Sequence, residues 1–201
     1  MTHRFPAKIV TALALVVVFA VAAVGSASAQ SSTLTLVGDK TKLVTDPATT
    51  KILLDAGIVP QPVGPTGFDV PPRNKKSVRY SFPITGGMVD AATLAGTIDH
   101  SGGINFVNTN NGSNLLLTDF RIEINADPGL TAAVGGTSLR VRILDLDLAK
   151  AKVLAKGKTI RVKNVGATLT ADAAGALNAT LGVSFFAPGI KLGTAQVFAR
   201  V

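Results

Sequence analysis

Few side chains in this sequence could support chemistry. After residue 29 the chain holds one histidine, His100, and one tyrosine, Tyr80, and the whole chain lacks cysteine and tryptophan. A serine triad would need His100 as its base, but the Gly-x-Ser-x-Gly pentad of a nucleophile elbow is absent. The carboxylates of Asp145 and Asp147 are spaced as on the solvent face of an alternating strand. We therefore expect no enzyme activity.

A metal site is not expected either. Zinc needs three or four ligands from His, Cys, Asp or Glu, and a single imidazole without any cysteine does not supply such a set. The sequence also contains neither a P-loop nor an EF-hand loop. Binding, rather than catalysis, is the function class that this composition favours.

His100 and Tyr80 are the candidate binding residues. His100 lies in the stretch 94–106 and Tyr80 in the stretch 78–84, and strand parity turns both side chains inward. A buried tyrosine hydroxyl needs a partner, and imidazole is a suitable one. A tyrosinate can also ligate ferric haem, with an adjacent histidine to hold it. Two interpretations stay open: the two side chains line one pocket, or each is a satisfied member of the core.

The elements around these residues are predicted to be mostly strands. Breaks in the alternating pattern at Ile143-Leu144 and Lys163-Asn164 predict bulges, which are typical of the strongly bent sheet of a sandwich or barrel. Short helices are predicted between Asp46 and Gly57 and between Leu169 and Gly182. We predict a mainly β, antiparallel, sandwich-like single domain over residues 30–201, with an exposed Pro- and Gly-rich loop at 60–77.

Three local features complete this prediction. Residues 34–37 and 41–45 form a short β ribbon, and Gly86-Gly87 is a turn. Asn111-Gly112 is a hairpin turn.

Residues 1–29 predict a signal peptide. His3, Arg4 and Lys8 make a basic start, an apolar run follows over 9–24, and the small-x-small site ends at Ala29. The run is short for a spanning helix, which needs about 20 residues, although a signal-anchor is the alternative. No second run of that length follows, so no stable transmembrane span is expected after cleavage. The protein is therefore expected to be secreted or to lie in the extracytoplasmic cell envelope.

A basic surface is predicted around a turn at Gly157. Because residues 1–29 carry two of the 20 basic residues and no acid, cleavage lowers the net charge from +8 to +6. Lys150, Lys152, Lys156 and Lys158 lie close together and are followed by Arg161 and Lys163. This surface is either a solvated hairpin or a contact for a cell-wall polymer, an anionic lipid or an envelope protein. Nucleic acid is not expected, because no aromatic residues are interleaved with these charges.

Three segments resemble a known family. Residues 80–90 (Tyr-Ser-Phe-Pro-Ile-Thr-Gly-Gly-Met-Val-Asp) and 96–104 (Gly-Thr-Ile-Asp-His-Ser-Gly-Gly-Ile) resemble the second half of the Htaa domain, and residues 169–177 resemble its Leu-Thr-x-x-Gly-Ala segment. The resemblance covers roughly residues 78–201. This family of actinobacterial secreted and surface proteins serves haem uptake. The resemblance implies the family fold, haem as ligand, and for His100 a role in assisting haem ligation.

The first half of the chain departs from the family pattern. There the family carries Trp, Lys and Ser-Phe-x-x-Tyr, whose tyrosine ligates iron, whereas residues 30–77 of this chain contain neither Trp nor Tyr. Tyr80 stands at a different place in the pattern. Two functions therefore stay open. One is an exported binding protein of the cell envelope, with haem or another anionic ligand at His100 and Tyr80. The other is a non-catalytic structural or interaction protein of the envelope with no small-molecule ligand.

Overall fold

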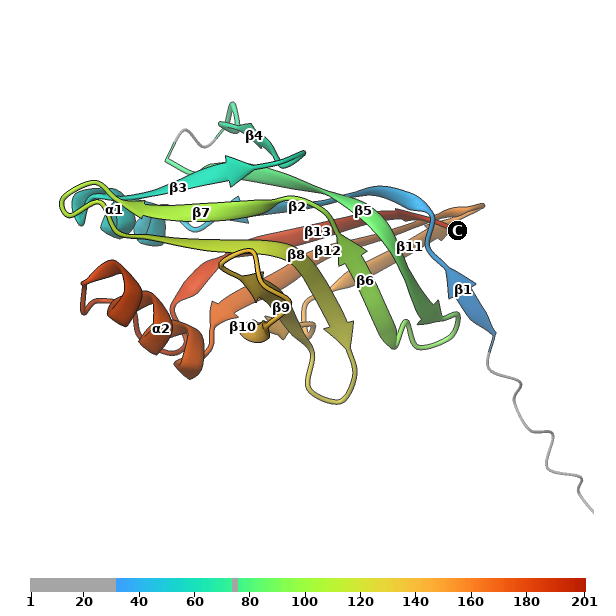
Figure 1. Ribbon diagram of the computed structural model, residues 1–201. Helices are drawn as coiled ribbons and strands as arrows, with labels where there is room; N and C mark the ends of the chain where they lie inside the picture. The colour runs from blue at the N-terminus through green and yellow to red at the C-terminus, as the bar shows by residue number, and fades with distance from the viewer. Residues whose placement is uncertain (1–31, 74–75) are drawn as a thin grey trace, which may run out of the picture. The chain divides into compact units, whose positions relative to one another are not determined.

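The computed structural model describes residues 32–73 and 76–201, so the predicted signal peptide, residues 1–29, lies outside the described residues. Antiparallel strands dominate this part of the chain (Figure 1). The strands are β1 (Thr33–Thr35), β2 (Gly38–Thr45), β3 (Ile58–Val63), β4 (Gly67–Asp69), β5 (Arg79–Asp90), β6 (Gly96–His100), β7 (Gly103–Asn108), β8 (Asn114–Ile124), β9 (Gly129–Val134), β10 (Arg140–Asp147), β11 (Lys152–Lys156), β12 (Thr159–Leu169) and β13 (Lys191–Arg200). The helices are α1 (Pro47–Asp55) and α2 (Ala171–Leu181).

The sheet closes on itself, which corrects the predicted sandwich. Eight of the described strands follow one another as β5, β2, β13, β12, β10, β9, β8 and β6, and β6 pairs again with β5. A sandwich would need two separate sheets, whereas here β6 joins the two ends of one sheet. The result is an eight-stranded antiparallel barrel with extra strands. A barrel of this size is just wide enough to be filled by side chains or to hold one small ligand.

Bulges bend the strands around the barrel. The predicted bulge at Ile143-Leu144 is confirmed, because the register of β10 against β9 shifts between Arg142 and Leu144. The one at Lys163-Asn164 is also confirmed by a register shift in β12, where Asn164 has φ +61°. A third bulge, in β8 at Asp119 (φ +50°), was not predicted. Each bulge keeps the apolar residues on both of its sides facing the barrel interior.

The two helices lie at one end of the barrel (Figure 1). The Asp46 carboxylate accepts hydrogen bonds from the backbone N–H groups of Ala48 and Thr49 at 3.0 and 3.4 Å, and so caps α1 as predicted. Thr170 caps α2 through the backbone N–H of Ala173 at 3.2 Å, and the left-handed Gly182 ends that helix. Contacts of α2 with β8 and β10 hold it against the barrel wall.

The predicted loop at 60–77 is only partly a loop. Residues 60–63 belong to β3 and residues 67–69 form β4. Pro60 and Pro62 are tolerated in β3 because this strand pairs only with β7 within the described chain, and an edge strand can do without some of its N–H donors.

Two other local predictions are wrong. Strands β1 and β2 do not pair as a ribbon, because both pair with β5. Gly86 and Gly87 bend β5 rather than end it, next to a register shift against β6. Both errors have the same cause: β5 is longer than its alternating stretch suggested. It continues through the two glycines to Asp90, and its end pairs with β1. The hairpin turn at Asn111-Gly112 is confirmed between β7 and β8.

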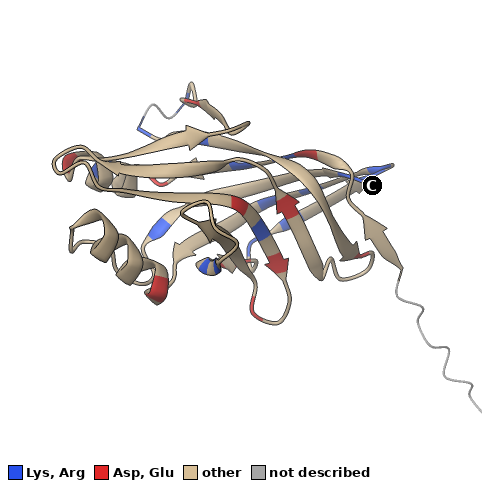
Figure 2. Ribbon diagram, viewed as in Figure 1, with Lys and Arg blue, Asp and Glu red and all other residues tan. Residues whose placement is uncertain are grey.

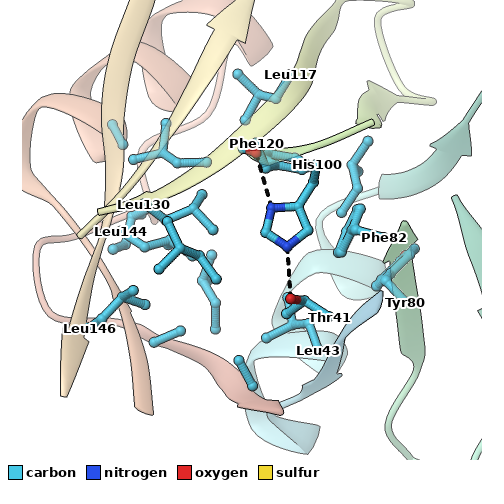
Figure 3. A pocket seen from close by; sticks show the side chains of 18 of the residues that line it. Thr41, Leu43, Tyr80, Phe82, His100, Leu117, Phe120, Leu130, Leu144 and Leu146 are labelled. Carbon is cyan, nitrogen blue, oxygen red and sulfur yellow. Dashed lines mark hydrogen bonds between the residues drawn. The ribbon is translucent and has the colours of Figure 1, made fainter. Parts of the chain in front are cut away.

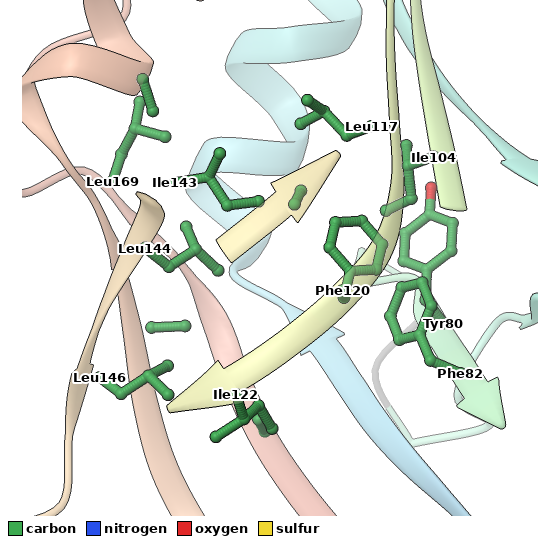
Figure 4. Packing of buried hydrophobic residues seen from close by; sticks show 14 of the residues in the cluster. Tyr80, Phe82, Ile104, Leu117, Phe120, Ile122, Ile143, Leu144, Leu146 and Leu169 are labelled. Atoms are coloured by element: carbon green, nitrogen blue, oxygen red, sulfur yellow. The ribbon is translucent and has the colours of Figure 1, made fainter. Parts of the chain in front are cut away.

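Apolar side chains line the inside of the barrel (Figure 4). The aromatic rings form one cluster on β5 and β8: the centroids of Tyr80 and Phe82 are 6.3 Å apart, and those of Phe82 and Phe120 are 5.0 Å apart, edge to face. Leu144, Leu146 and Leu169 face them from β10 and β12. The core and the barrel interior are therefore the same space.

Candidate ligand-binding site

The barrel interior is not completely filled. It contains a cavity of about 370 Å³, within the range of about 300–1,000 Å³ that is usual for small-molecule sites. Its walls are aliphatic and aromatic, and among the described residues that line it none is Asp, Glu, Lys or Arg. Its few polar side chains are His100, Tyr80 and several threonines.

The cavity opens near α2. Ala176 and Thr180 of this helix line the cavity and are exposed, and so is Leu139 in the turn before β10. Thr49, Thr50 and Leu53 of α1 line the same end. The mouth therefore lies at the helical end of the barrel, and the two helices form part of its rim.

His100 lies deep in this cavity, as strand parity predicted. Ile98, His100, Ile104 and Phe106 all line it, because β6 and β7 both pair with β8 and continue each other across residues 101–102. The His100 side chain is almost completely buried, with 4 % of the residue exposed. The imidazole reaches from β6 toward β2 across the cavity wall (Figure 3).

Both ring nitrogens of His100 have partners. Nδ1 is 3.1 Å from the backbone oxygen of Phe120, and since a carbonyl only accepts, Nδ1 carries the proton and donates it. Nε2 then has a lone pair, and it accepts a hydrogen bond from Oγ1 of Thr41 at 2.7 Å. Burial lowers the pKa of His100 to about 4, against the smaller opposing effect of the Phe120 carbonyl. The imidazole is therefore neutral near pH 7, with a defined tautomer.

The bulge in β8 supplies the partner of Nδ1. The β8–β9 ladder passes from Thr118 to Arg121 and skips Asp119 and Phe120. The Phe120 carbonyl is thus outside that ladder and accepts from His100 instead. The alternating pattern could not predict this link between a bulge and an imidazole. Three consecutive leucines, Leu115, Leu116 and Leu117, do not show which face of the strand points inward.

Tyr80 lines the same cavity but does not bind His100. Its hydroxyl donates to the backbone oxygen of Pro60 in the neighbouring β3 at 2.9 Å. Burial raises the pKa of Tyr80 to about 12, so the side chain is a neutral phenol near pH 7. The structure thus brings both sequence-predicted residues into one cavity and gives each a separate hydrogen-bond partner.

Sequence reasoning missed Thr41. Its hydroxyl is buried, with 5 % of the residue exposed, and it contacts an imidazole 59 residues further along the chain. Its signal in the sequence is weak: a lone threonine between Lys40 and Lys42, at the inward parity of β2. Only the barrel topology, which places β2 and β6 on either side of β5, shows what it contacts.

The predicted basic surface lies elsewhere. Lys150, Lys152, Lys156 and Lys158 are exposed in and beside β11, and none of them lines the cavity. Arg161 is exposed on the paired strand β12, and basic residues gather near the C-terminus in Figure 2. Cavity and basic surface are separate features.

The described residues offer neither a cluster of metal ligands nor a membrane-spanning helix. Within residues 32–73 and 76–201, no three His, Cys, Asp or Glu side chains gather closely enough to hold a metal ion. In the same residues, neither helix has the length and hydrophobicity of a membrane span.

Comparison with known proteins identifies relatives of the chain. The family model described as Htaa matches residues 66–182. Comparison with curated proteins gave no match.

Three solved structures share the fold. The C-terminal domain of HtaA from Corynebacterium glutamicum has a TM-score of 0.59 and 16% sequence identity, over 82% of this chain and 98% of that one. A domain-swapped dimer of a histidine-to-alanine variant of that domain has a TM-score of 0.53 and 17% identity, over 77% and 90% of the two chains. The haem-binding protein HtaB of the same organism has a TM-score of 0.52 and 10% identity, over 84% and 96%.

Proposed function

The chain belongs to the Htaa family, and from this we propose that it is an exported, non-catalytic binding protein of the cell envelope whose ligand is haem. The observation that carries the proposal is the apolar cavity with His100 in its wall. A solved relative of the same fold, HtaB, is a haem-binding protein. The signal peptide predicted at residues 1–29 supports export.

The residues around the cavity fit haem in three respects. The walls are apolar, as the faces of a porphyrin require. His100 is neutral, which is the form of imidazole that binds metals, and its Nδ1 donates to a backbone carbonyl, as the second nitrogen of a metal-bound histidine usually does. The lining holds no charge, so the two propionates would remain at the mouth, near solvent. When bound, haem would supply a Lewis-acidic iron, and the chain would orient it and exclude water.

The rival function is a structural or interaction protein of the envelope without a small-molecule ligand. The basic surface around β11 is the observation that favours it. In that case the cavity would be only a loosely packed core, and its residues would affect stability alone.

A haemin titration followed by absorption spectroscopy tests the proposal. The wild-type protein should give a saturable change in the Soret band at one haemin per chain. Ala176→Phe, at the mouth, should weaken binding at least about tenfold, and His100→Ala should change the spectrum. Ala179→Phe is the matched control, because Ala179 is exposed on the same helix but does not line the cavity. A wild-type spectrum without saturation would refute haem binding.

A further inference from the structure

We propose that Nε2 of His100 is the iron-ligating atom in this chain, and that the Thr41 hydroxyl is a latch that occupies its lone pair until haem binds. The inference rests on the proposed function and deepens it. In the resemblance noted above, a tyrosine ligates the iron and the histidine assists. Here the structure favours the reverse, for three reasons.

The first reason is the orientation of the imidazole. Because Nδ1 donates to Phe120, the ring is fixed with its Nε2 lone pair directed away from β8 and toward the Thr41 hydroxyl of β2 (Figure 3). A neutral ring, held at one nitrogen by a carbonyl and with a lone pair at the other, has the arrangement of a metal-binding histidine. The arrangement is already present without a ligand.

The second reason is the partner of Nε2. Thr41 Oγ1 is a single hydroxyl, which can leave Nε2 by rotation about its own side chain. No backbone bond of β2 or β6 has to break for this change. The Thr41 hydroxyl thus satisfies a buried acceptor in the free protein and competes with iron for the same lone pair.

The third reason is that the tyrosine is committed elsewhere. Tyr80 donates to the Pro60 carbonyl at 2.9 Å, and loss of its proton would leave a phenolate beside that oxygen. Ligation by Tyr80 would therefore cost this hydrogen bond and leave the Pro60 carbonyl without its phenol donor, which disfavours a tyrosinate ligand at this position.

The decisive variant is Thr41→Val, which removes the latch and leaves His100 in place. It should bind haemin about three- to tenfold more tightly than the wild type, because iron no longer displaces a hydrogen bond. Iron-free protoporphyrin is the matched probe: its affinity should not rise in this variant. Tyr80→Phe should leave the absorption and electron paramagnetic resonance spectra of the haemin complex unchanged.

The outcomes separate the two levels of the proposal. A phenolate charge-transfer band that disappears in Tyr80→Phe would overturn ligation by His100 and leave haem binding intact. Equal haemin affinities of Thr41→Val and the wild type would overturn the latch. Wild-type affinities that are equal for haemin and protoporphyrin would show that iron is not ligated. No saturable haemin binding by any variant would overturn the proposed function itself.

A second inference comes from the opposite end of the barrel: we propose that it docks on an anionic phospholipid bilayer. The docking surface, called here the basic face, consists of the outward residues of β11, β12, β13 and β2 near the C-terminus. Cross-strand register places Leu154, Arg161, Phe198 and Lys40 in one row. The next row holds Lys156, Thr159 and Arg200.

Positive charge dominates the basic face. Arg161 and Lys42 lie over the Phe198 ring, at 4.6 and 5.2 Å from its centroid. Two acidic residues lie next to this face. The Asp39 carboxylate is 3.9 Å from the Lys40 ammonium, and Asp69, which is ion-paired with Arg79, also interacts electrostatically with Lys42. Lys152, Lys156 and Lys158 extend the charge along β11 and its turn, where β11 has no strand partner other than β12 in the described chain.

Apolar side chains are exposed among these charges. Leu154 of β11 is 55% exposed, and Val37, whose N–H donates to the Arg200 carbonyl at 2.9 Å, is 63% exposed. A soluble polyanion would need the charges alone. A bilayer with anionic headgroups can contact both kinds of side chain. The lysines bind the headgroups, and the neighbouring apolar side chains enter the membrane interface. The combination therefore favours a membrane over a wall polymer.

Co-sedimentation with vesicles tests this docking. The protein should bind vesicles that contain phosphatidylglycerol, weakly bind pure phosphatidylcholine, and dissociate as salt is raised. Lys156→Gln combined with Arg161→Gln should lower the affinity at least about tenfold, and Leu154→Ser about threefold at unchanged charge. Lys51→Gln, on α1 at the helical end, is the matched control and should have no effect.

Two results would overturn it. Binding to anionic vesicles that is insensitive to Leu154→Ser would show adsorption by charge without insertion. Binding to purified wall teichoic acid but not to vesicles would identify the polymer as the partner.

Discussion

Oγ1 of Thr41 donates a hydrogen bond to Nε2 of His100 along the inner side of the barrel wall, at 2.7 Å. The two residues belong to β2 and β6, which do not pair with each other and are held apart by β5. The contact thus depends on closure of the sheet. It also occupies the one in-plane lone pair of the neutral imidazole, so a ligand that binds Nε2 must displace the Thr41 hydroxyl.

Stability should fall in acid because of His100. The folded protein binds a proton at this residue only near pH 4, whereas the unfolded chain binds it below about 6.5. Between these values the unfolded state binds more protons, so the free energy of unfolding should decrease as pH falls from 6.5 to 4, by roughly 3 kcal/mol at most. Denaturant unfolding at a series of pH values measures the slope. His100→Gln, which cannot titrate, should lose it, and an equal slope in both proteins would contradict this prediction.

Tyr80→Phe should destabilise the fold by about 1 kcal/mol. The change leaves the Pro60 carbonyl without the phenol donor that links β5 to β3. Thermal or urea unfolding measures the loss. Phe68→Leu is a suitable control, since Phe68 is half exposed against the same ring and should change stability by less than about 0.5 kcal/mol. A Tyr80→Phe protein as stable as the wild type would show that the bond is not made in solution.

Gly96→Ala should disrupt barrel closure. Gly96 begins β6 with φ +146°, and an added Cβ would lie 2.0 Å from the Met88 carbonyl oxygen of β5. We expect a loss of at least about 2 kcal/mol and faster hydrogen exchange in β6. Gly175→Ala is the opposite case: it lies in α2 with open space around it and should stabilise by about 0.5–1 kcal/mol. Similar effects of both changes would contradict the close pairing of β5 and β6.

Local features of the fold could be predicted from the sequence, whereas its closure could not. Parity alone placed Ile98, His100, Ile104 and Phe106 on the inner face, because the strand period survives the break at residues 101–102. The bulge at Ile143-Leu144 was visible because apolar residues change from odd to even positions there. The pairing of β6 with both β5 and β8 is a long-range choice that no local pattern encodes, and it makes a barrel of what was predicted as a sandwich.

The same limit applies to the site. His100 and Tyr80 could be selected because they are the lone imidazole and the lone phenol after residue 29. Their partners are a threonine hydroxyl and two backbone carbonyls, groups that occur everywhere in a chain and carry no sequence signature. Hence the sequence could point to two residues that line one cavity, but not to the groups that they bind.

The intrinsic fluorescence of Tyr80 offers the most direct test of the central claim, that haem occupies the barrel cavity. The chain has no tryptophan and one tyrosine, so its emission reports on the cavity wall alone. Titration with haemin should quench this emission to a plateau at one haemin per chain. Ala176→Phe should shift the quenching to at least about tenfold higher haemin, and Ala179→Phe should not. Shallow quenching without a plateau, or equal curves for the two variants, would contradict a site inside the barrel.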